Sequence, residues 1–189
     1  MLIGVVGLNG SGKDTVAEYL VKTHNFAHRD LGQEIRDELK RLGRNYLDRN
    51  EMISFANEMR QRFGFNYWCK RAIDSIKGGD VIITSIRNPS EAEEIKRRNG
   101  IIIEVFVDQK RRFERTVERV KSDPNAHGDI NFEDFKAKEE RELTSSNPAN
   151  QQLLKCISMS DYKLDNNSSL EELHRQIEHI LAVIKDKQD

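Results

Sequence analysis

A chain of 189 residues is long enough to bury one substantial hydrophobic core and is short for two domains. Its 31 Lys and Arg residues are balanced by 32 Asp and Glu residues, so no overall basic field is available to recruit nucleic acid. No apolar run approaches the roughly 18 consecutive residues of a membrane span, and no signal-peptide pattern stands at the start, so we expect a cytoplasmic protein.

The first expected element is a buried strand from Leu2 to Val6, an apolar run rich in β-branched residues. A glycine-rich turn follows, and the pattern after Lys13 is helical. Gly7, Gly12 and Lys13 fit the phosphate-binding loop G-x-x-x-x-G-K, in which backbone amides, the positive helix end and the lysine surround phosphates. We therefore predict an ATP-phosphate site made of Gly7, Asn9, Gly10, Ser11, Gly12, Lys13, Asp14 and Thr15.

One position departs from the common motif, because Asp14 follows the lysine where Ser or Thr usually holds magnesium. Asp14 could bind Mg²⁺ directly, bind it through water, or only favour the helix N-terminus as an acidic residue of the first turn. Thr15 is the better candidate for a hydroxyl on a phosphate oxygen. Asp14 and Thr15 are therefore the candidate metal ligands.

A short second strand is expected from Phe26 and ends at Asp30, which begins a helix that Gly43 stops. Asp30 is a good N-cap, but at the carboxyl edge of a sheet it would also face a bound substrate. Arg36 lies off the apolar stripe and is either an anion contact or a surface residue.

Residues 49–76 are predicted to be helical with a break near Gly64. Their Met and aromatic stripes form either core or the wall of an acceptor pocket. The cations between the stripes are expected to be solvated: Arg60, Arg62, Lys70 and Arg71.

Arg87 comes directly after a third strand, Asp80 to Thr84, and before a helix that Pro89 begins. This connection lies at the carboxyl edge of the predicted sheet. A planar guanidinium suits a phosphate or carboxylate there, so we favour contact with substrate over a surface role.

A fourth strand is expected over 101–107, and the next helix is expected to turn Phe113, Val117 and Val120 toward the core. The stretch from Ser122 to Phe132 has a loop composition, and a charged helix follows it to about residue 143. We interpret 111–141 as a lid that excludes water from phosphates, with an inert surface loop as the alternative. The lid arginines would be Arg111, Arg112, Arg115, Arg119 and Arg141, the first four opposite the core side.

The C-terminal part predicts a short helix around Leu153, a fifth strand over 161–165 and a last helix with a clear apolar stripe from Leu170 to Ile184. Cys69 and Cys156 have no spacing of a metal site or a bridge and are expected to be buried in a reducing compartment.

These motifs resemble the P-loop nucleoside monophosphate kinases and, more loosely, the dephospho-CoA kinases. The loop from Gly7 to Thr15 is similar to that of some deoxynucleoside monophosphate kinases, through its Gly-Lys-Asp-Thr segment. Asp30 with Arg36, and the strand that leads to Arg87, look like acceptor-binding segments of such kinases, while 160–173 resembles the closing strand and helix of dephospho-CoA kinases. Where many relatives have an acidic residue at the end of the third strand, this chain has Thr84.

The resemblance implies an α/β, three-layer P-loop fold in a single domain, 1–189: a five-stranded parallel sheet with helices on both faces, a helical acceptor region over about 30–76 and a lid over about 111–141. The alternation of strands and helices predicts the same architecture by itself. It further implies a kinase that uses ATP with Mg²⁺ to phosphorylate a nucleoside monophosphate-like acceptor. Transfer to a hydroxyl, as in dephospho-CoA kinases, is the alternative.

The catalytic candidates follow from these roles. Lys13 and the loop amides would stabilise the transferring group, and Arg115 and Arg119, with Arg141, would neutralise the transition state. Asp30 becomes the base if the acceptor is a hydroxyl. The acceptor-binding candidates are Asp30, Arg36 and Arg87, and Arg87 would fix the acceptor for reaction.

Two other classes compete with a kinase. A regulatory NTPase would more often show a strand-end Asp-x-x-Gly or a water-positioning Gln, and the sequence has neither in evident form. Phosphorylation of a modified base within a polynucleotide is disfavoured by the lack of a basic patch.

Overall fold

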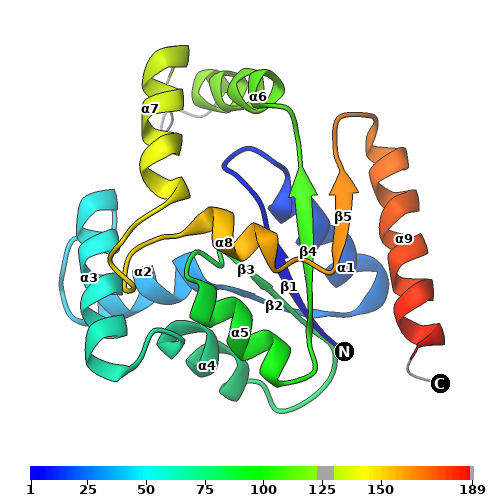
Figure 1. The fold of residues 1–189 in the computed structure, drawn as a ribbon, viewed down its shortest axis with the longest axis horizontal. Coiled ribbons are helices and arrows are strands. Elements are labelled where there is room, and N and C mark those ends of the chain that lie inside the picture. The colour runs from blue at the N-terminus through cyan, green and yellow to red at the C-terminus, as the bar shows by residue number, and fades with distance from the viewer. Residues whose placement is uncertain (123–129, 188–189) are drawn as a thin grey trace.

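The computed structural model describes residues 1–122 and 130–187, and its central element is a five-stranded parallel sheet (Figure 1). The strand order is β2-β3-β1-β4-β5, which places β1 in the middle. Leu2 of β1 pairs with Val81 on one side, and Ile3 pairs with Ile101 on the other. The strands are β1 (Leu2–Val6), β2 (Ala27–Asp30), β3 (Val81–Thr84), β4 (Ile101–Phe106) and β5 (Tyr162–Asp165).

Helices cover both faces of this sheet, so the predicted three-layer α/β fold is confirmed. α1 and α9 lie on one face, whereas α5 and α8 pack on the other. The described helices are α1 (Lys13–His24), α2 (Leu31–Arg41), α3 (Arg49–Phe63), α4 (Tyr67–Asp74), α5 (Pro89–Arg97), α6 (Gln109–Ser122), α7 (Phe132–Leu143), α8 (Leu153–Ser158) and α9 (Leu170–Asp186).

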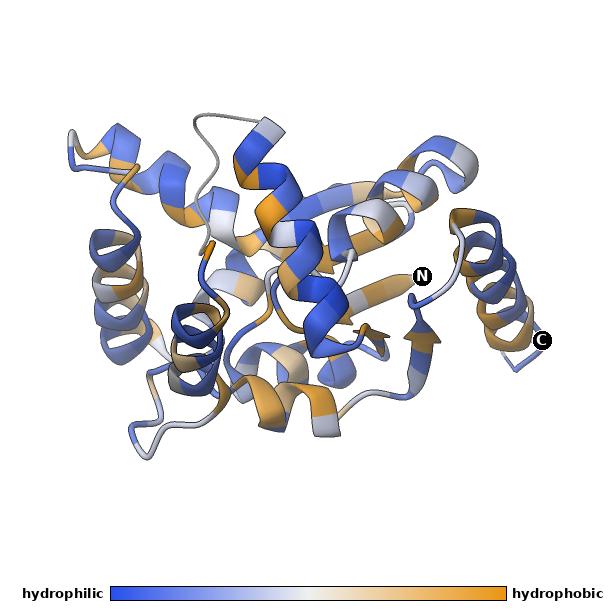
Figure 2. Cartoon of the chain, turned by 90° about the horizontal axis from the view of Figure 1, so that it is seen from above, coloured by the Kyte–Doolittle hydropathy of each residue, from blue (hydrophilic) through white to orange (hydrophobic). Residues whose placement is uncertain are grey.

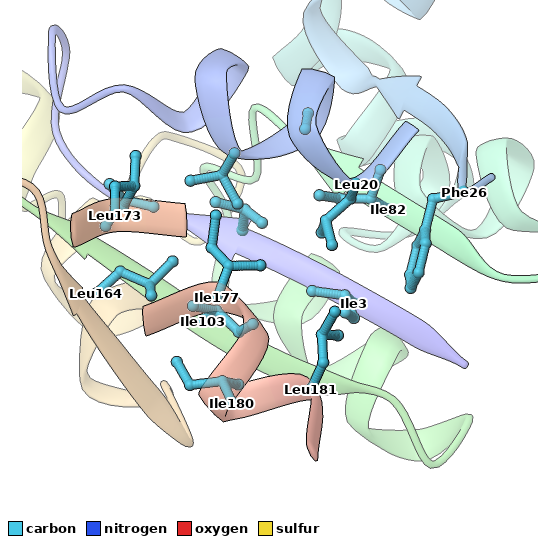
Figure 3. Packing of buried hydrophobic residues seen from close by; sticks show 14 of the residues in the cluster. Ile3, Leu20, Phe26, Ile82, Ile103, Leu164, Leu173, Ile177, Ile180 and Leu181 are labelled. Atoms are coloured by element: carbon cyan, nitrogen blue, oxygen red, sulfur yellow. The ribbon is translucent and has the colours of Figure 1, made fainter. Parts of the chain in front are cut away.

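The core on the first face joins the middle of the sheet to α1 and α9 (Figure 3). Ile3, Leu20 and Ile177 are almost completely buried in it. Seen from above, the strand that begins at the N-terminus is apolar, while helices such as α9 carry both polar and apolar residues (Figure 2). The apolar stripe predicted for the last helix therefore packs against the sheet, as its 3.6-residue period requires.

Gly4 shows how closely the second face is packed. A Cβ added at Gly4 would lie 2.6 Å from Ile95 Cδ1 and 2.7 Å from Ile102 Cδ1. Such contacts are too short for carbon atoms, so a side chain at this position would force these isoleucines to shift, and glycine lets α5 lie close to the strand.

The helices α2, α3 and α4 form a separate apolar cluster beside the sheet. Phe55 and Trp68 are buried there with an edge-to-face geometry, and Trp68 Nε1 donates a hydrogen bond of 3.2 Å to the Ala56 carbonyl. The predicted break at Gly64 separates α3 from α4, with φ at +108°. These stripes are core, which was one of the two interpretations of the sequence.

The sequence prediction of which side of α6 is buried is wrong. Arg112 is only 2% exposed, and its Nη2 donates a hydrogen bond of 3.0 Å to Glu139 of α7. Phe113 packs instead on Phe132 and Phe135 of α7, with ring centroids 5.2 and 5.6 Å apart. α6 packs against α7 beyond the end of β4, so its apolar stripe serves that helix pair and not the sheet.

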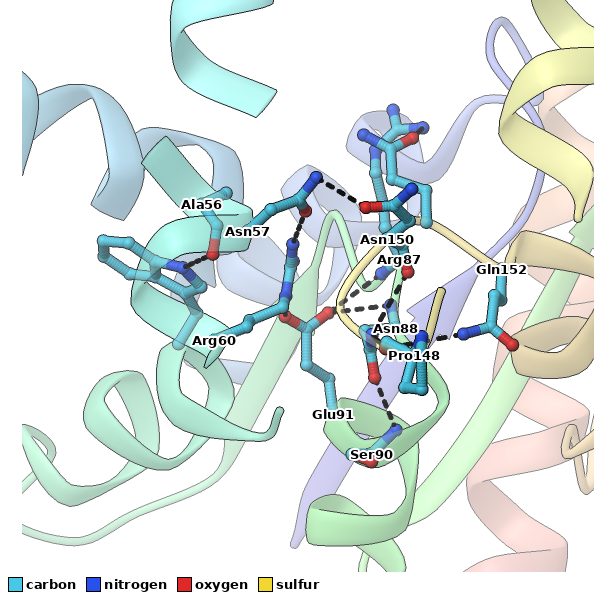
Figure 4. Close-up of polar contacts among 12 residues, drawn as sticks. Ala56, Asn57, Arg60, Arg87, Asn88, Ser90, Glu91, Pro148, Asn150 and Gln152 are labelled. Atoms are coloured by element: carbon cyan, nitrogen blue, oxygen red, sulfur yellow. Dashed lines mark hydrogen bonds and ion pairs between the residues drawn. The ribbon is translucent and has the colours of Figure 1, made fainter. Parts of the chain in front are cut away.

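Arg60 is a second correction, because it is buried where the sequence predicted a solvated side chain. Its Nε and Nη2 donate to Glu91 Oε1 at 3.0 and 2.7 Å (Figure 4). The other oxygen of Glu91 accepts hydrogen bonds of 3.0 and 3.1 Å from the backbone amides of Arg87 and Asn88. One fully buried carboxylate therefore connects α3 with the start of α5.

We expect the substitution Arg60→Met to lower the free energy of unfolding by about 3–5 kcal/mol, because it leaves the buried charge of Glu91 without its partner. Arg62→Met is the matched control, since Arg62 is exposed on the same helix and its loss should change stability by less than about 0.5 kcal/mol. Urea unfolding of both variants measures the difference. Equal effects would contradict a special role for the Arg60–Glu91 pair.

Candidate active site

The phosphate loop connects the end of β1 to the start of α1, as predicted from the motif. Gly10 and Gly12 have φ angles of +78° and +94°, which side chains other than glycine rarely adopt. A Cβ at Gly10 would lie 2.9 Å from the Arg112 carbonyl, and one at Gly12 would clash with the Asn166 amide. Both positions of the loop therefore require glycine, because of the backbone angle and because neighbouring atoms leave no room for a side chain.

Lys13 is held against the loop by a hydrogen bond of 2.9 Å from Nζ to the Leu8 carbonyl. Burial, and to a smaller extent the charge of Arg87, lower its pKa from the ordinary 10.5 to about 8, against weaker opposite effects of nearby carboxylates such as Asp14 and Asp30. A buried ammonium group beside another cation is stabilised by an added anion. This is the electrostatic setting of a phosphate site.

Two further groups complete the loop. The Ser11 hydroxyl is buried and has no hydrogen-bond partner among the described residues; a Cβ placed on Gly7 would lie 2.8 Å from it, so it lies against the start of the loop. Asn166, which follows β5, donates a hydrogen bond of 2.8 Å from Nδ2 to the Ser11 carbonyl. The Asn166 side-chain amide therefore connects the loop to the end of the edge strand β5. The sequence interpretation did not include this residue in the site.

A cavity of about 340 Å³ lies between the loop, α6 and the connection from β5 to α9. Arg115 spans this gap, because its Nη2 donates to the Asn166 carbonyl at 2.9 Å. The volume falls in the range of small-molecule pockets. The lining residues that come from the predicted site are Gly10, Gly12, Lys13, Asp14, Thr15, Arg115 and Arg119.

Asp30 caps α2 and also lies at the carboxyl edge of the sheet, so its two predicted positions coincide. Its Oδ1 accepts a hydrogen bond of 2.8 Å from the Gln33 amide, and its Oδ2 accepts bonds from Ser85 at 2.9 Å and Thr84 at 3.1 Å. Burial alone would raise the pKa of Asp30, but these donors and the nearby His28 lower it below the ordinary value. The carboxylate is therefore ionised at neutral pH.

Two of the predicted acceptor-binding residues, Asp30 and Arg36, lie beside Gly32. A Cβ added there would lie 2.9 Å from Asp30 Oδ1, 3.6 Å from Ser85 Oγ and 3.7 Å from Arg36 Nη1. Arg36 is exposed, but its guanidinium reaches this place beside Asp30. A carboxylate, a hydroxyl and a guanidinium thus surround a residue without a side chain, where a small ligand can approach.

Arg87 lies beside the phosphate loop. Its Nη2 donates to Asn9 Oδ1 at 2.9 Å, and its Nη1 donates to Glu142 Oε2 at 2.7 Å. Asn9 in turn donates from Nδ2 to the same oxygen of Glu142 at 3.0 Å. Glu142, from the last turn of α7, also forms an ion pair with Arg49. Arg87 is thus close to the loop, with a carboxylate of its own chain against its guanidinium.

Residues 3–142 match the profile of a family described as an AAA domain. The chain belongs to this AAA-domain family. A UPF0200 protein of Thermoplasma volcanium is 26% identical over 184 residues, covering 95% of this chain and 96% of the relative. A UPF0200 protein of Thermococcus kodakarensis is 28% identical over 197 residues, covering 99% and 100%.

Solved structures with kinase folds resemble this AAA-domain chain over nearly its whole length. Shikimate kinase from Acinetobacter baumannii, in complex with shikimate, has a TM-score of 0.53 at 17% identity and covers 98% of this chain and 93% of its own. Shikimate kinase from Bacteroides thetaiotaomicron has a TM-score of 0.58 at 13% identity, with 98% of each chain covered. TT1252 from Thermus thermophilus reaches 0.59 at 21%, with 96% of each covered. The fold is that of P-loop kinases; the resemblance to nucleoside monophosphate or dephospho-CoA kinases stays a prediction.

The lid arginines of the AAA-domain chain are divided among several places. Arg115 and Arg119 line the cavity, and Arg111 is exposed and donates to the Asn167 carbonyl. Arg112 does not face the cavity with its guanidinium, which is buried against Glu139. The side chain of Arg141 and residues 123–129 of the expected loop lie outside the described part of the protein.

The candidate metal ligands sit at the mouth of the same cavity. Asp14 is exposed, and Asp14 and Thr15 line the cavity next to Lys13. The described residues contain no group of three or more His, Cys, Asp or Glu side chains that could hold a metal ion. Mg²⁺ bound to a nucleotide usually takes only one or two protein ligands besides phosphate oxygens and water, so this donor pair fits such an ion.

Several residues of the site were missed from the sequence: Arg49, Thr116, Glu142 and Asn166. Asn166 directly follows the predicted fifth strand, and its place at the carboxyl edge of the sheet is the sequence signal for it. Glu142 and Arg49 lie on charged helices with no motif around them. Only the packing of α3 and α7 brings them to Arg87. In the described part of the chain, no helix has the length and apolar character needed to cross a membrane.

We expect Lys13→Met to be more stable than the wild type at pH 7. The unfolded chain binds the Lys13 proton with the ordinary pKa of 10.5 but the folded chain with a pKa of about 8, so the charged lysine opposes folding at neutral pH. This cost disappears as pH rises from about 8 to 10.5. Over that interval the free energy of unfolding of the wild type should rise relative to that of the variant.

Urea unfolding at several pH values measures this difference. Lys22→Met is the control, because Lys22 is exposed on the same helix, and its effect on stability should be the same at every pH. If the difference between wild type and Lys13→Met does not change with pH, the proposed effect of burial on Lys13 is wrong.

Proposed function

We propose that this protein is a kinase that transfers the γ-phosphoryl group of ATP to a hydroxyl of a small, anionic acceptor. The observation that carries the proposal is the position of Asp30: it is ionised, it lies at the carboxyl end of β2, and it is near enough to Lys13 of the phosphate loop to raise the pKa of that lysine. The likeness to solved kinase structures, one of them in complex with the hydroxyl-bearing molecule shikimate, supports a kinase over other P-loop enzymes.

The nucleotide would occupy the loop and the 340 Å³ cavity. Lys13 and the loop amides would bind its phosphates, while Arg115 and Arg119 from α6 would contact the rest of the nucleotide or the transferring group. The positions of these arginines support a role of α6 in nucleotide binding. GTP fits the same loop, so the donor base is part of the test.

Asp14 and Thr15 would hold Mg²⁺ at the loop, and the ion would neutralise charge on the β- and γ-phosphates. Thr84 does not take the place of a second carboxylate, because it is buried; its hydroxyl donates to Asp30 and lies 2.8 Å from His28 Nε2. The carboxylate that this chain would supply at a strand end near the loop is therefore Asp30.

The acceptor would bind over Gly32, between Asp30, Arg36 and Arg87. Its hydroxyl oxygen forms a bond to the γ-phosphorus as the bond from that phosphorus to the β-phosphate oxygen breaks, ADP leaves, and the hydroxyl proton passes to Asp30. The ionised Asp30 disfavours a phosphate nucleophile at the same point through repulsion. This is why we prefer a hydroxyl acceptor to the nucleoside monophosphate acceptor that the sequence resemblance favoured.

The acceptor region of about 30–76 and the lid of about 111–141 belong to this proposal within a single domain. The two buried, free cysteines, Cys69 and Cys156, fit a reducing compartment such as the cytoplasm.

A panel of acceptors with ATP and with GTP tests the function. We expect phosphorylated product, and ADP release, with a hydroxyl acceptor such as dephospho-CoA or a hydroxy acid in preference to nucleoside and deoxynucleoside monophosphates. Lys13→Ala should reduce turnover by about a hundred- to a thousandfold, and Asp30→Asn by about a hundred- to ten-thousandfold. Asn at position 30 still caps α2, so the fold should be kept.

The contrary outcomes are distinct. Product only with a monophosphate, at a rate that Asp30→Asn does not change, would favour the other acceptor class. ADP release that no acceptor stimulates, and that a protein partner alters, would favour a regulatory NTPase.

Arg87→Lys tests which substrate Arg87 binds. Lysine keeps the charge but not the planar pair of donors, so the apparent Michaelis constant for the acceptor should rise, turnover should fall, and the constant for ATP should stay nearly unchanged. Steady-state kinetics with each substrate varied in turn measures this. A loss of ATP affinity with unchanged acceptor affinity would place Arg87 on the nucleotide side.

A further inference from the structure

The carboxylate of Glu142 is enclosed by donors from three other parts of the chain. Arg87, after β3, donates to it at 2.7 Å; Asn9, in the phosphate loop, donates at 3.0 Å; and Arg49, at the start of α3, forms an ion pair with it. The Glu142 side chain is only 13% exposed and that of Arg87 21%. A surface ion pair is not enclosed in this way.

The positions of Glu142 and Arg49 on their helices cannot be explained by helix stability. Glu142 is in the last turn of α7, where the negative end of the helix disfavours a carboxylate. Arg49 is the first residue of α3, where the positive end disfavours a cation. Each charge is on the less favourable end of its helix, so the contact between them, and with Arg87, decides their placement.

Burial by itself would raise the pKa of Glu142, but the charges of Arg87 and Arg49 lower it below the ordinary value, so the group is an anion at neutral pH. The donors around it are two guanidinium groups and one side-chain amide. These are the groups that proteins use to bind phosphate and carboxylate. The Glu142 carboxylate therefore sits where an anionic group of a ligand would be bound.

We propose that Arg49, Arg87 and Asn9 form a binding site for the anionic group of the acceptor, and that Glu142 occupies this site as an internal substitute which the acceptor displaces. The ligand chemistry is a phosphate or carboxylate group on the acceptor. This inference rests on the proposed function only in naming the ligand as the acceptor; the anion site itself does not depend on phosphoryl transfer.

The internal carboxylate gives the site selectivity. A neutral acceptor cannot replace an anion that holds two arginines, because the largely buried Arg87 would be left uncompensated beside Lys13. An acceptor with an anionic group restores the balance and frees Asn9 from Glu142. Arg49 is therefore a specificity-determining residue that the sequence did not suggest.

Binding of inorganic phosphate, without nucleotide, tests the site by isothermal titration. Because the phosphate ion no longer competes with a charged carboxylate, Glu142→Gln should bind it about tenfold more tightly than the wild type. Glu140→Gln is the matched control, since Glu140 is exposed two residues earlier on the same helix and should leave phosphate affinity unchanged.

Phosphate also binds the phosphate loop, so a second substitution separates the two sites. Arg49→Gln in the Glu142→Gln background should abolish the tighter binding, because Arg49 belongs to the proposed site and the loop is unchanged. If Glu142→Gln does not fold, Glu142→Asp is the second variant. It keeps the negative charge, but its shorter side chain holds the arginines less closely, so it too should bind phosphate more tightly than the wild type.

Equal phosphate affinity of wild type and the Glu142 variants would overturn the proposal, as would tighter binding that survives Arg49→Gln. These measurements contain no ATP and no acceptor. A failure of the proposed kinase activity therefore leaves the result on the anion site unaffected, and the two can be judged separately.

Discussion

The buried carboxylate of Glu91 is the interaction on which the acceptor side of the structure depends. It accepts four hydrogen bonds, two from the Arg60 guanidinium and two from the backbone amides of Arg87 and Asn88. It thereby joins α3 to the connection after β3 and completes the capping box of α5. A buried carboxylate that loses one of its hydrogen-bond donors is strongly destabilising. The four bonds therefore fix the backbone from which the Arg87 side chain reaches the phosphate loop.

The charged groups around the phosphate loop shift one another's pKa values. Arg87 lowers the pKa of Lys13 while Asp30 and Glu142 oppose it, and Arg87 in turn keeps Glu142 ionised. Groups of opposite charge thus lie close to the predicted phosphate loop. Perturbed groups of this kind gather at functional sites, because a site that binds changing charge must leave some of its own charge incompletely balanced.

Membership of the AAA-domain family and the likeness to kinase folds define the architecture but not the acceptor. What distinguishes acceptors here are side chains on three different elements. In the proposed function, Asp30 at the end of β2 favours a hydroxyl, and the pair of Arg49 and Arg87 favours an anionic group. These residues come from the end of β2, the start of α3 and the connection after β3, so the proposed selectivity depends on how the three parts of the chain meet.

Local sequence patterns determined the strands, most helices, the phosphate loop, and the positions of Asp30 and Arg87 at strand ends. They did so because periodicity, glycine spacing and capping act between residues close in the chain. The pairs Arg112–Glu139, Arg60–Glu91 and Arg87–Glu142 were missed, and their partners are 27, 31 and 55 residues apart. A charged residue on a helix has the same local pattern whether it is solvated or buried against a partner. Only the packing of α3 on α5, and of α7 beside the loop and α6, decides between the two.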